Sequence, residues 1–203
     1  MIQTFLRVPR GPAEMLADGL RLVGAVCIVV ALIGWPWVDV AVFALALVGL
    51  VVPRFLGIRP GLDIAFCIIV LIAAWSALLE LYDAIEYLDV VVHFFLNGLT
   101  AAVCYILAVR LDVVPDPTKT PVPLGAIVAL TTAFGLAAGV LWELAEWVGH
   151  TYIDESIFVG YDDTIADFAA GGLGALCAGL FGRSLVDESR YVPARQTLRS
   201  EPV

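Results

Sequence analysis

LDVVVHFFLNGLTAAVCYILAVR, residues 88–110, is the stretch that decides the fold class of this chain. Apart from Asp89, His93 and Asn97 in its first half, it is almost entirely apolar until it ends at Arg110. A helix needs about 20 residues to cross the hydrocarbon core of a bilayer. The stretch therefore predicts a transmembrane helix whose ionisable side chains gather near one membrane face.

The composition of the whole chain agrees with a membrane protein. Of its 203 residues, 61% are hydrophobic and 15% are charged, and the mean hydropathy is +0.95. Soluble domains are about 45–50% apolar and about 25% charged, so the composition excludes a water-soluble fold. The basic residues are not interleaved with aromatic residues, and we expect no nucleic-acid partner.

Six apolar runs, separated by breaks that contain proline, set out the helices. The runs are Leu20–Trp35, Val38–Val52, Leu62–Tyr82, Leu88–Arg110, Val122–Gly149 and Thr164–Phe181. They predict an all-α, polytopic transmembrane bundle of about six helices. Its expected parts are a cytoplasmic N-terminal segment at 1–19, a six-helix transmembrane domain at 20–182 and a cytoplasmic polar tail at 183–203.

The basic residues predict the orientation of these helices. Six helices with a cytoplasmic N-terminus place every lysine and arginine on the cytoplasmic side. These residues are Arg7, Arg10, Arg21, Arg54, Arg59, Arg110, Lys119, Arg183, Arg190, Arg195 and Arg199. Positively charged connections stay in the cytoplasm during insertion. We therefore expect both chain ends to be cytoplasmic.

Acidic residues and both histidines fall at the opposite face, in three segments with helical spacing. The segments contain Asp89, His93 and Asn97; Glu143, Glu146 and His150; and Asp163 and Asp167. Small residues continue two of these stripes at four-residue steps, namely Gly171, Ala175 and Gly179 after Asp167, and Gly139 and Gly135 before Glu143. Small residues at this spacing let membrane helices approach closely. The polar stripes should therefore face the interior of the bundle.

Carboxylates that converge without a lysine or arginine repel one another, so protons, a divalent cation or open water must offset their charge. Carboxylate and imidazole together suit a divalent metal such as Zn, Mn or Fe. The predicted ligands or acid–base groups are His93, Glu143, Glu146, His150, Asp163 and Asp167, with Glu143 and Asp163 as the catalytic candidates. Second choices are Asp83, Glu86 and Asp89.

Structural roles compete with this interpretation. Asp162 or Asp163 could cap the N-terminus of the last helix. His93 could form a hydrogen bond between helices. Glu143 could likewise serve only the packing of helix ends. The sequence leaves these alternatives open.

Three motifs carry a resemblance to a known family. They are Asp89-Val-Val-Val-His93-Phe-Phe, Trp142-Glu143-Leu-Ala-Glu146-Trp147 and Tyr161-Asp162-Asp163-Thr164-Ile-Ala-Asp167. Between Leu62 and Gly182 the chain resembles the YjdF-like bacterial inner-membrane proteins, whose domain has no known function, and it is similar to the broader VanZ-like pattern. VanZ-like proteins usually carry a basic residue and an Asn in the last motif, where this chain has Asp162 and Ala170 or a neighbour of Ala170. The resemblance implies a multi-pass protein of the bacterial inner membrane and the location of its site.

Three functions follow from the polar cluster. The first is a metal-dependent hydrolase that acts on membrane lipid or a lipid-linked envelope precursor. The second is a proton- or cation-coupled transporter, which would need polar residues through the whole membrane; the inner halves offer only Ser76, Thr100, Thr131 and Thr132. The third is a non-catalytic membrane scaffold. The sequence does not fix the metal, the substrate or the oligomeric state.

Overall fold

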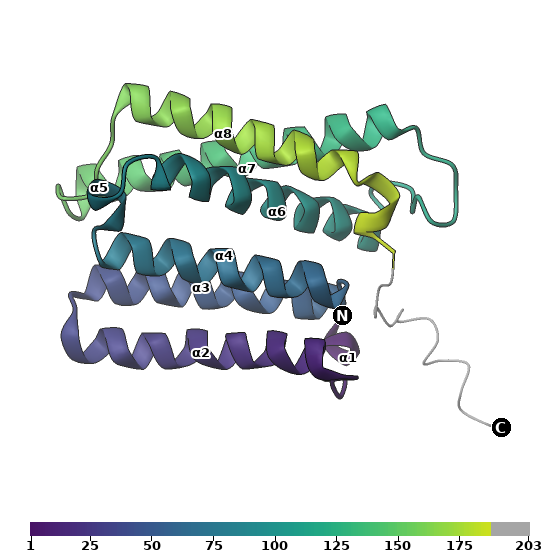
Figure 1. Cartoon of the computed structure of the whole chain (residues 1–203), viewed down its shortest axis with the longest axis horizontal. Helices are drawn as coiled ribbons and strands as arrows, with labels where there is room; N and C mark the ends of the chain where they lie inside the picture. The colour runs from purple at the N-terminus through teal and green to yellow at the C-terminus, as the bar shows by residue number, and fades with distance from the viewer. Residues whose placement is uncertain (188–203) are drawn as a thin grey trace. The chain divides into compact units, whose positions relative to one another are not determined.

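A computed structural model describes residues 1–187, and every regular element in that range is helical. The elements are α1 (Ile2–Phe5), α2 (Pro12–Gly34), α3 (Trp37–Leu56), α4 (Pro60–Leu78), α5 (Leu81–Ala84), α6 (Leu88–Arg110), α7 (Leu124–Tyr152), α8 (Tyr161–Leu180) and the 3-10 turn η1 (Gly182–Leu185) (Figure 1). The all-α prediction is confirmed. The predicted polar tail lies mostly outside the described residues.

Five of these helices are long and apolar enough to cross a membrane, namely α2, α3, α4, α6 and α7. The sequence predicted about six spans. The difference is α8, which is 20 residues long. Three aspartates in its first two turns and four glycines along it lower its mean hydropathy. The described residues thus contain several apolar helices of membrane-spanning length.

Most helix boundaries differ from the apolar runs by one to four residues, and the start of α2 differs by eight. Helix α2 begins at Pro12, well before the run that starts at Leu20, and its polar residues Glu14 and Arg21 are buried within the fold. Helix α4 ends at Leu78, earlier than predicted, since Glu80 adopts a left-handed backbone conformation with φ 53°. Helix α6 begins and ends as the sequence predicted.

The described residues form two compact units. The first contains Met1–Leu78 and residues 186–187. In it, α2, α3 and α4 pack against one another around Cys27, Ala31, Phe43, Ala74 and Leu78 (Figure 1). The Phe43 and Trp75 rings meet edge to face with their centroids 5.2 Å apart.

Buried ion pairs hold one end of this first unit together. The Arg21 guanidinium on α2 pairs with Asp63 on α4, and its Nε donates to the Leu50 carbonyl oxygen on α3 at 2.9 Å. Arg54 on α3 pairs with Asp18 on α2 at 3.2 Å. Opposite charges thus join all three helices, which explains how arginines and acids are buried in a membrane protein.

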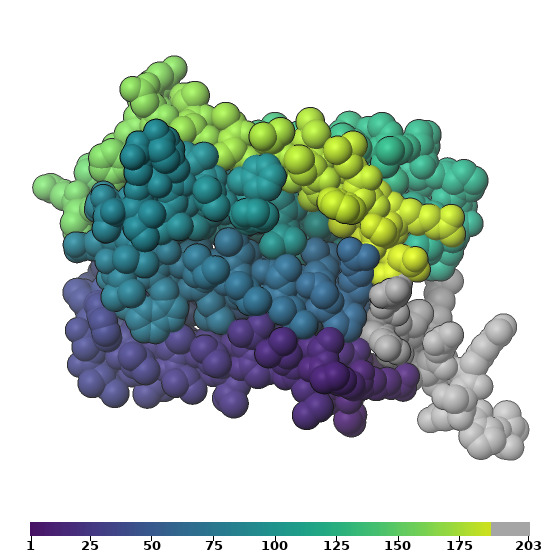
Figure 2. All heavy atoms as spheres, in the orientation of Figure 1, coloured from purple at the N-terminus to yellow at the C-terminus, as the bar shows by residue number. Residues whose placement is uncertain are grey.

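The second unit contains Leu79–Leu185. Its helices α6, α7 and α8 pack together, and α7 runs opposite to the other two. The backbones of α6 and α8 approach closely, because a Cβ on Gly174 would collide with the Phe94 carbonyl oxygen and one on Gly98 would lie 2.8 Å from the Gly174 oxygen. Figure 2 shows the yellow-green atoms of α8 in contact with the teal atoms of α6.

Glycine and alanine make this approach possible, as the sequence predicted. The stripe of Asp167, Gly171, Ala175 and Gly179 is buried along its whole length. Gly135 and Gly139 on α7 are buried as well. The packing brings the N-terminal ends of α6 and α8 beside the C-terminal end of α7. The three polar segments therefore meet at one end of the second unit.

Candidate metal centre

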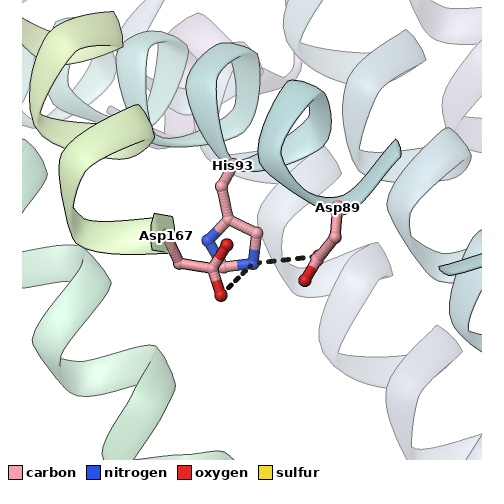
Figure 3. A group of neighbouring side chains, drawn as sticks. All are labelled: Asp89, His93 and Asp167. Atoms are coloured by element: carbon pink, nitrogen blue, oxygen red, sulfur yellow. Dashed lines mark ion pairs between the residues drawn. The ribbon is translucent and has the colours of Figure 1, made fainter. Parts of the chain in front are cut away.

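Asp89, His93 and Asp167 form a close group at this end of the unit. Asp89 lies in the first turn of α6, and His93 follows one turn later on the same face. Their partner Asp167 comes from α8. The His93 Nε2 atom lies 3.4 Å from Asp89 Oδ1 and 3.8 Å from Asp167 Oδ2 (Figure 3). One ligand atom from each residue lies within 4.8 Å of the other two.

Asp167 is the most deeply buried carboxylate of this group. Its side chain is 4% exposed. Its Oδ1 atom is buried and accepts no hydrogen bond from the described residues. Nearly all buried polar atoms in proteins have a partner, and an exception calls for an explanation such as an ion or a water. The Asp167 Oδ1 atom therefore lacks a partner among the described residues, and a bound ion or water would supply one.

Glu143 on α7 brings a second unpartnered oxygen to the same place. Its Oε2 accepts a hydrogen bond from the Thr164 hydroxyl at 2.6 Å. Its Oε1 is buried, and no donor in the described part of the chain reaches it. The Glu143 charge acts on Asp89, His93 and Asp167, so this carboxylate lies near all three members of the group.

The charge of the site is not balanced by basic side chains. Residues 79–185 contain three of them, Arg110, Lys119 and Arg183. All three lie at the opposite end of the unit, because Arg110 is the last residue of α6, Lys119 precedes α7 and Arg183 follows α8. The N-terminal dipoles of α6 and α8 offset part of the negative charge. A bound cation would offset the remainder.

The other predicted ligands occupy different positions. Asp163 and Glu146 are partly buried, and their charges act on Asp167. The His150 ring lies apart from the close group, and its Nδ1 atom is 2.6 Å from the Ile157 carbonyl oxygen. Asp83 and Glu86 are exposed. The structure thus brings together His93 and Asp167 with Asp89, a second choice from the sequence.

The capping interpretation of the last helix is wrong. Gly160 is the N-cap residue of α8, and no side chain caps the helix there. Asp162 and Asp163 lie in the first turn instead, where their charges are favoured by the helix dipole. Because Asp163 does not cap α8, its carboxylate can take part in the cluster.

Below the cluster the helices close tightly. The Asn97 side chain fills the space beside Gly139 and Gly171, since a Cβ on either glycine would meet its amide nitrogen. One turn deeper, a Cβ on Gly135 would collide with the Ala175 methyl group and come within 3.1 Å of the Ala101 Cβ. The polar stripe therefore ends against a layer of closely packed small residues.

Two carboxylates and one imidazole match the ligand chemistry of divalent metals. Zinc in catalytic sites takes three protein ligands from histidine and carboxylate side chains and keeps a further position open. Manganese and iron accept the same donor types. Asp89, His93 and Asp167 supply such a set, and the unpartnered Asp167 oxygen fits it.

Comparison with known proteins gives the family of the chain. No curated protein and no solved structure matches it significantly. The family described as "Predicted membrane protein (DUF2238)" matches residues 19–188. This range contains the close group, Glu143 and all five apolar helices except the first residues of α2. The chain therefore belongs to the DUF2238 family of membrane proteins.

Proposed function

We propose that this membrane protein binds a divalent metal ion through Asp89, His93 and Asp167. The observation that carries the proposal is the spacing around the His93 Nε2 atom. Its distances of 3.4 and 3.8 Å to the two aspartates are longer than an ordinary hydrogen bond of about 2.7–3.2 Å. Two ligand atoms about 2.1 Å from a tetrahedral ion lie about 3.4 Å apart, so the spacing suits a metal between them.

The buried, unpartnered oxygen of Asp167 supports the same proposal. A carboxylate in this position is stabilised when a cation fills the vacant side of the oxygen. The lack of basic residues at this end of the unit leaves that role open to an ion from solution. The other predicted ligands then orient the bound residues from outside, or become ligands after side chains rearrange. They are Glu146, Asp163 and His150.

A hydrolytic reaction is the function that best suits such a site. A bound metal would polarise a substrate oxygen and lower the pKa of water to near 7. Glu143 is placed to accept a proton, because its Oε1 atom is buried without a donor. Asp163 is the second candidate for this role. Exposed Trp147 and Tyr161 at the same end are typical of a membrane interface, which favours a lipid or lipid-linked envelope precursor as substrate.

The proposed topology has six spans, with α8 as the sixth and both chain ends in the cytoplasm. Helix α8 has 20 residues, about 30 Å of helix, which is enough to cross the hydrocarbon core. It packs along both α6 and α7, and Asp167 is buried within the fold. The positions of all eleven basic residues support this orientation.

This orientation puts the metal site at the extracytoplasmic face of a bacterial inner membrane, as the likeness to YjdF-like and VanZ-like proteins suggests. The expected sections are 1–19, 20–182 and 183–203. The basic residues that flank them support this division.

Transport is the weaker alternative. A proton or cation relay needs polar groups across the whole membrane. Below Asn97 a Cβ on Gly135 would collide with the Ala175 methyl group, and the polar groups deeper on α7 are the hydroxyls of Thr131 and Thr132, which carry no charge. A non-catalytic scaffold does not account for the unpartnered oxygens of Asp167 and Glu143.

Metal analysis of detergent-purified protein tests the proposal. We expect about one equivalent of Zn, Mn or Fe per chain, and saturable binding when zinc or manganese is added to the metal-free protein. H93A and D167N should lose this binding, and E155Q, a change at an exposed carboxylate after α7, should keep it. Wild-type protein that neither retains nor takes up a metal would overturn the proposal.

A further inference from the structure

The hydroxyl group of Thr164 makes a contact that the sequence did not predict. Thr164 lies on α8, one turn before Asp167, and its backbone N–H bonds to the Gly160 carbonyl oxygen at 2.9 Å as part of the helix. Its hydroxyl is free to reach across to α7, where it donates to Glu143 Oε2 at 2.6 Å. At this length the bond is a short hydrogen bond between the two helices.

This bond fixes which oxygen of Glu143 remains available. A carboxylate on a long side chain can rotate and exchange its two oxygens. The Thr164 hydroxyl engages Oε2 and leaves Oε1 buried without a donor from the described residues. The Glu143 charge acts on all three residues of the close group. Oε1 is thus the Glu143 oxygen that is left free to accept a hydrogen bond.

We propose that Thr164 is a positioning residue, which holds Glu143 so that its Oε1 atom accepts a hydrogen bond from water at the metal site. The inference rests on the metal site proposed above and adds a residue to it. Outer groups that orient the immediate surroundings of a metal typically change its affinity by about 10–100-fold. Thr164 acts through Glu143 and is not itself a ligand.

Two variants of Thr164 separate the effect of its hydroxyl from the effect of the rest of its side chain. Valine at position 164 keeps the branched shape but cannot donate, whereas serine keeps the donor and loses the methyl group. Thr132, deeper on the same helix as Glu143, provides a matched control because its hydroxyl is also buried and has no partner in the described range. Zinc and manganese titration gives the affinity of each purified variant.

We expect T164V to weaken metal binding about 10–100-fold, while T164S and T132V stay within about threefold of wild type. Wild-type protein that binds no metal would contradict the metal site itself. Metal binding that H93A abolishes and T164V leaves unchanged would overturn only the role of Thr164. An equal loss in T164V and T164S would overturn it as well, because the hydroxyl would then not be the cause.

A double-mutant cycle keeps the inference testable where a single variant folds poorly. Methionine at position 143 keeps a side chain of similar length but has no oxygen to accept the Thr164 hydroxyl. If Thr164 acts through Glu143, adding T164V to E143M should weaken metal binding no further than E143M alone. Additive losses would mean that Thr164 acts independently of Glu143, and the inference would fail.

Discussion

His93 on α6 and Asp167 on α8 face each other across a helix interface, with Nε2 and Oδ2 3.8 Å apart, while the second oxygen of Asp167 is buried without a partner among the described residues. Asp89 completes the group from one turn before His93 on α6. The glycines that let α6 and α8 approach closely also hold this arrangement, because Gly174 packs directly on the Phe94 backbone. The small residues on α6 and α8 thus allow both the close packing of the two helices and the grouping of Asp89, His93 and Asp167.

Replacing Asp167 should weaken metal binding but raise the unfolding temperature of the metal-free protein. The charges of Asp89, Asp163, Glu143 and Glu146 all act on Asp167, and no basic side chain in residues 79–185 lies near them. D167N removes one ligand and the buried carboxyl group whose ionisation this repulsion opposes. We expect metal binding to fall at least about 100-fold, and the metal-free protein to unfold about 2–4 °C higher for each kcal/mol of repulsion relieved.

Thermal unfolding in detergent with and without a chelator measures both effects. E155Q is the control, because Glu155 is exposed and outside the close group. A metal-free D167N protein that unfolds at a lower temperature than metal-free wild type would contradict the repulsion argument.

Gly174 should not tolerate a side chain. A Cβ at this position would collide with the Phe94 carbonyl oxygen, which is backbone and cannot move aside. G174A should lower the free energy of unfolding by about 1–3 kcal/mol through overpacking, and should weaken metal binding because α6 and α8 are forced apart. Gly125 offers the control, since a Cβ there meets nothing within 4 Å. Equal stability of G174A and G125A would show that the two helices do not pack this closely.

The ion pair of Arg21 and Asp63 should stabilise the first unit only while both partners are present. R21A leaves the Asp63 carboxylate buried without its partner guanidinium, and loss of one partner of a buried pair costs about 3–5 kcal/mol. The double variant R21M/D63L removes both charges and should recover much of this loss. Arg10 is exposed, so R10A serves as the control for unfolding measurements. An R21A protein as stable as R10A would mean that the pair contributes nothing.

Labelling of single cysteines tests the six-span topology. In a variant without native cysteines, an impermeant thiol reagent should label E155C in intact cells, because the connection between α7 and α8 is expected outside. K119C and R183C should react only after the membrane is opened. Labelling of R183C in intact cells would show that α8 does not span the membrane.

The sequence predicted the helices and the inward direction of the polar stripes, because apolar length and small-residue spacing both act locally. It missed the left-handed residues Glu80 and Tyr87, which end α4 and start α6 without a glycine to mark them. It ranked His150 above Asp89. The His150 ring instead lies 2.6 Å from the Ile157 carbonyl oxygen, and this contact depends on the path of the loop after α7. The spacing of Asp89 four residues before His93 was the available signal.

X-ray absorption at the edge of the metal that the purified protein takes up tests the central proposal most directly. The method reports the type and distance of the atoms bound to the ion. We predict one imidazole nitrogen at about 2.0–2.1 Å and carboxylate oxygens at about 2.0–2.2 Å, with the imidazole signal lost in H93A and kept in E155Q. A spectrum without an imidazole ligand in the wild-type protein would contradict the proposed metal site.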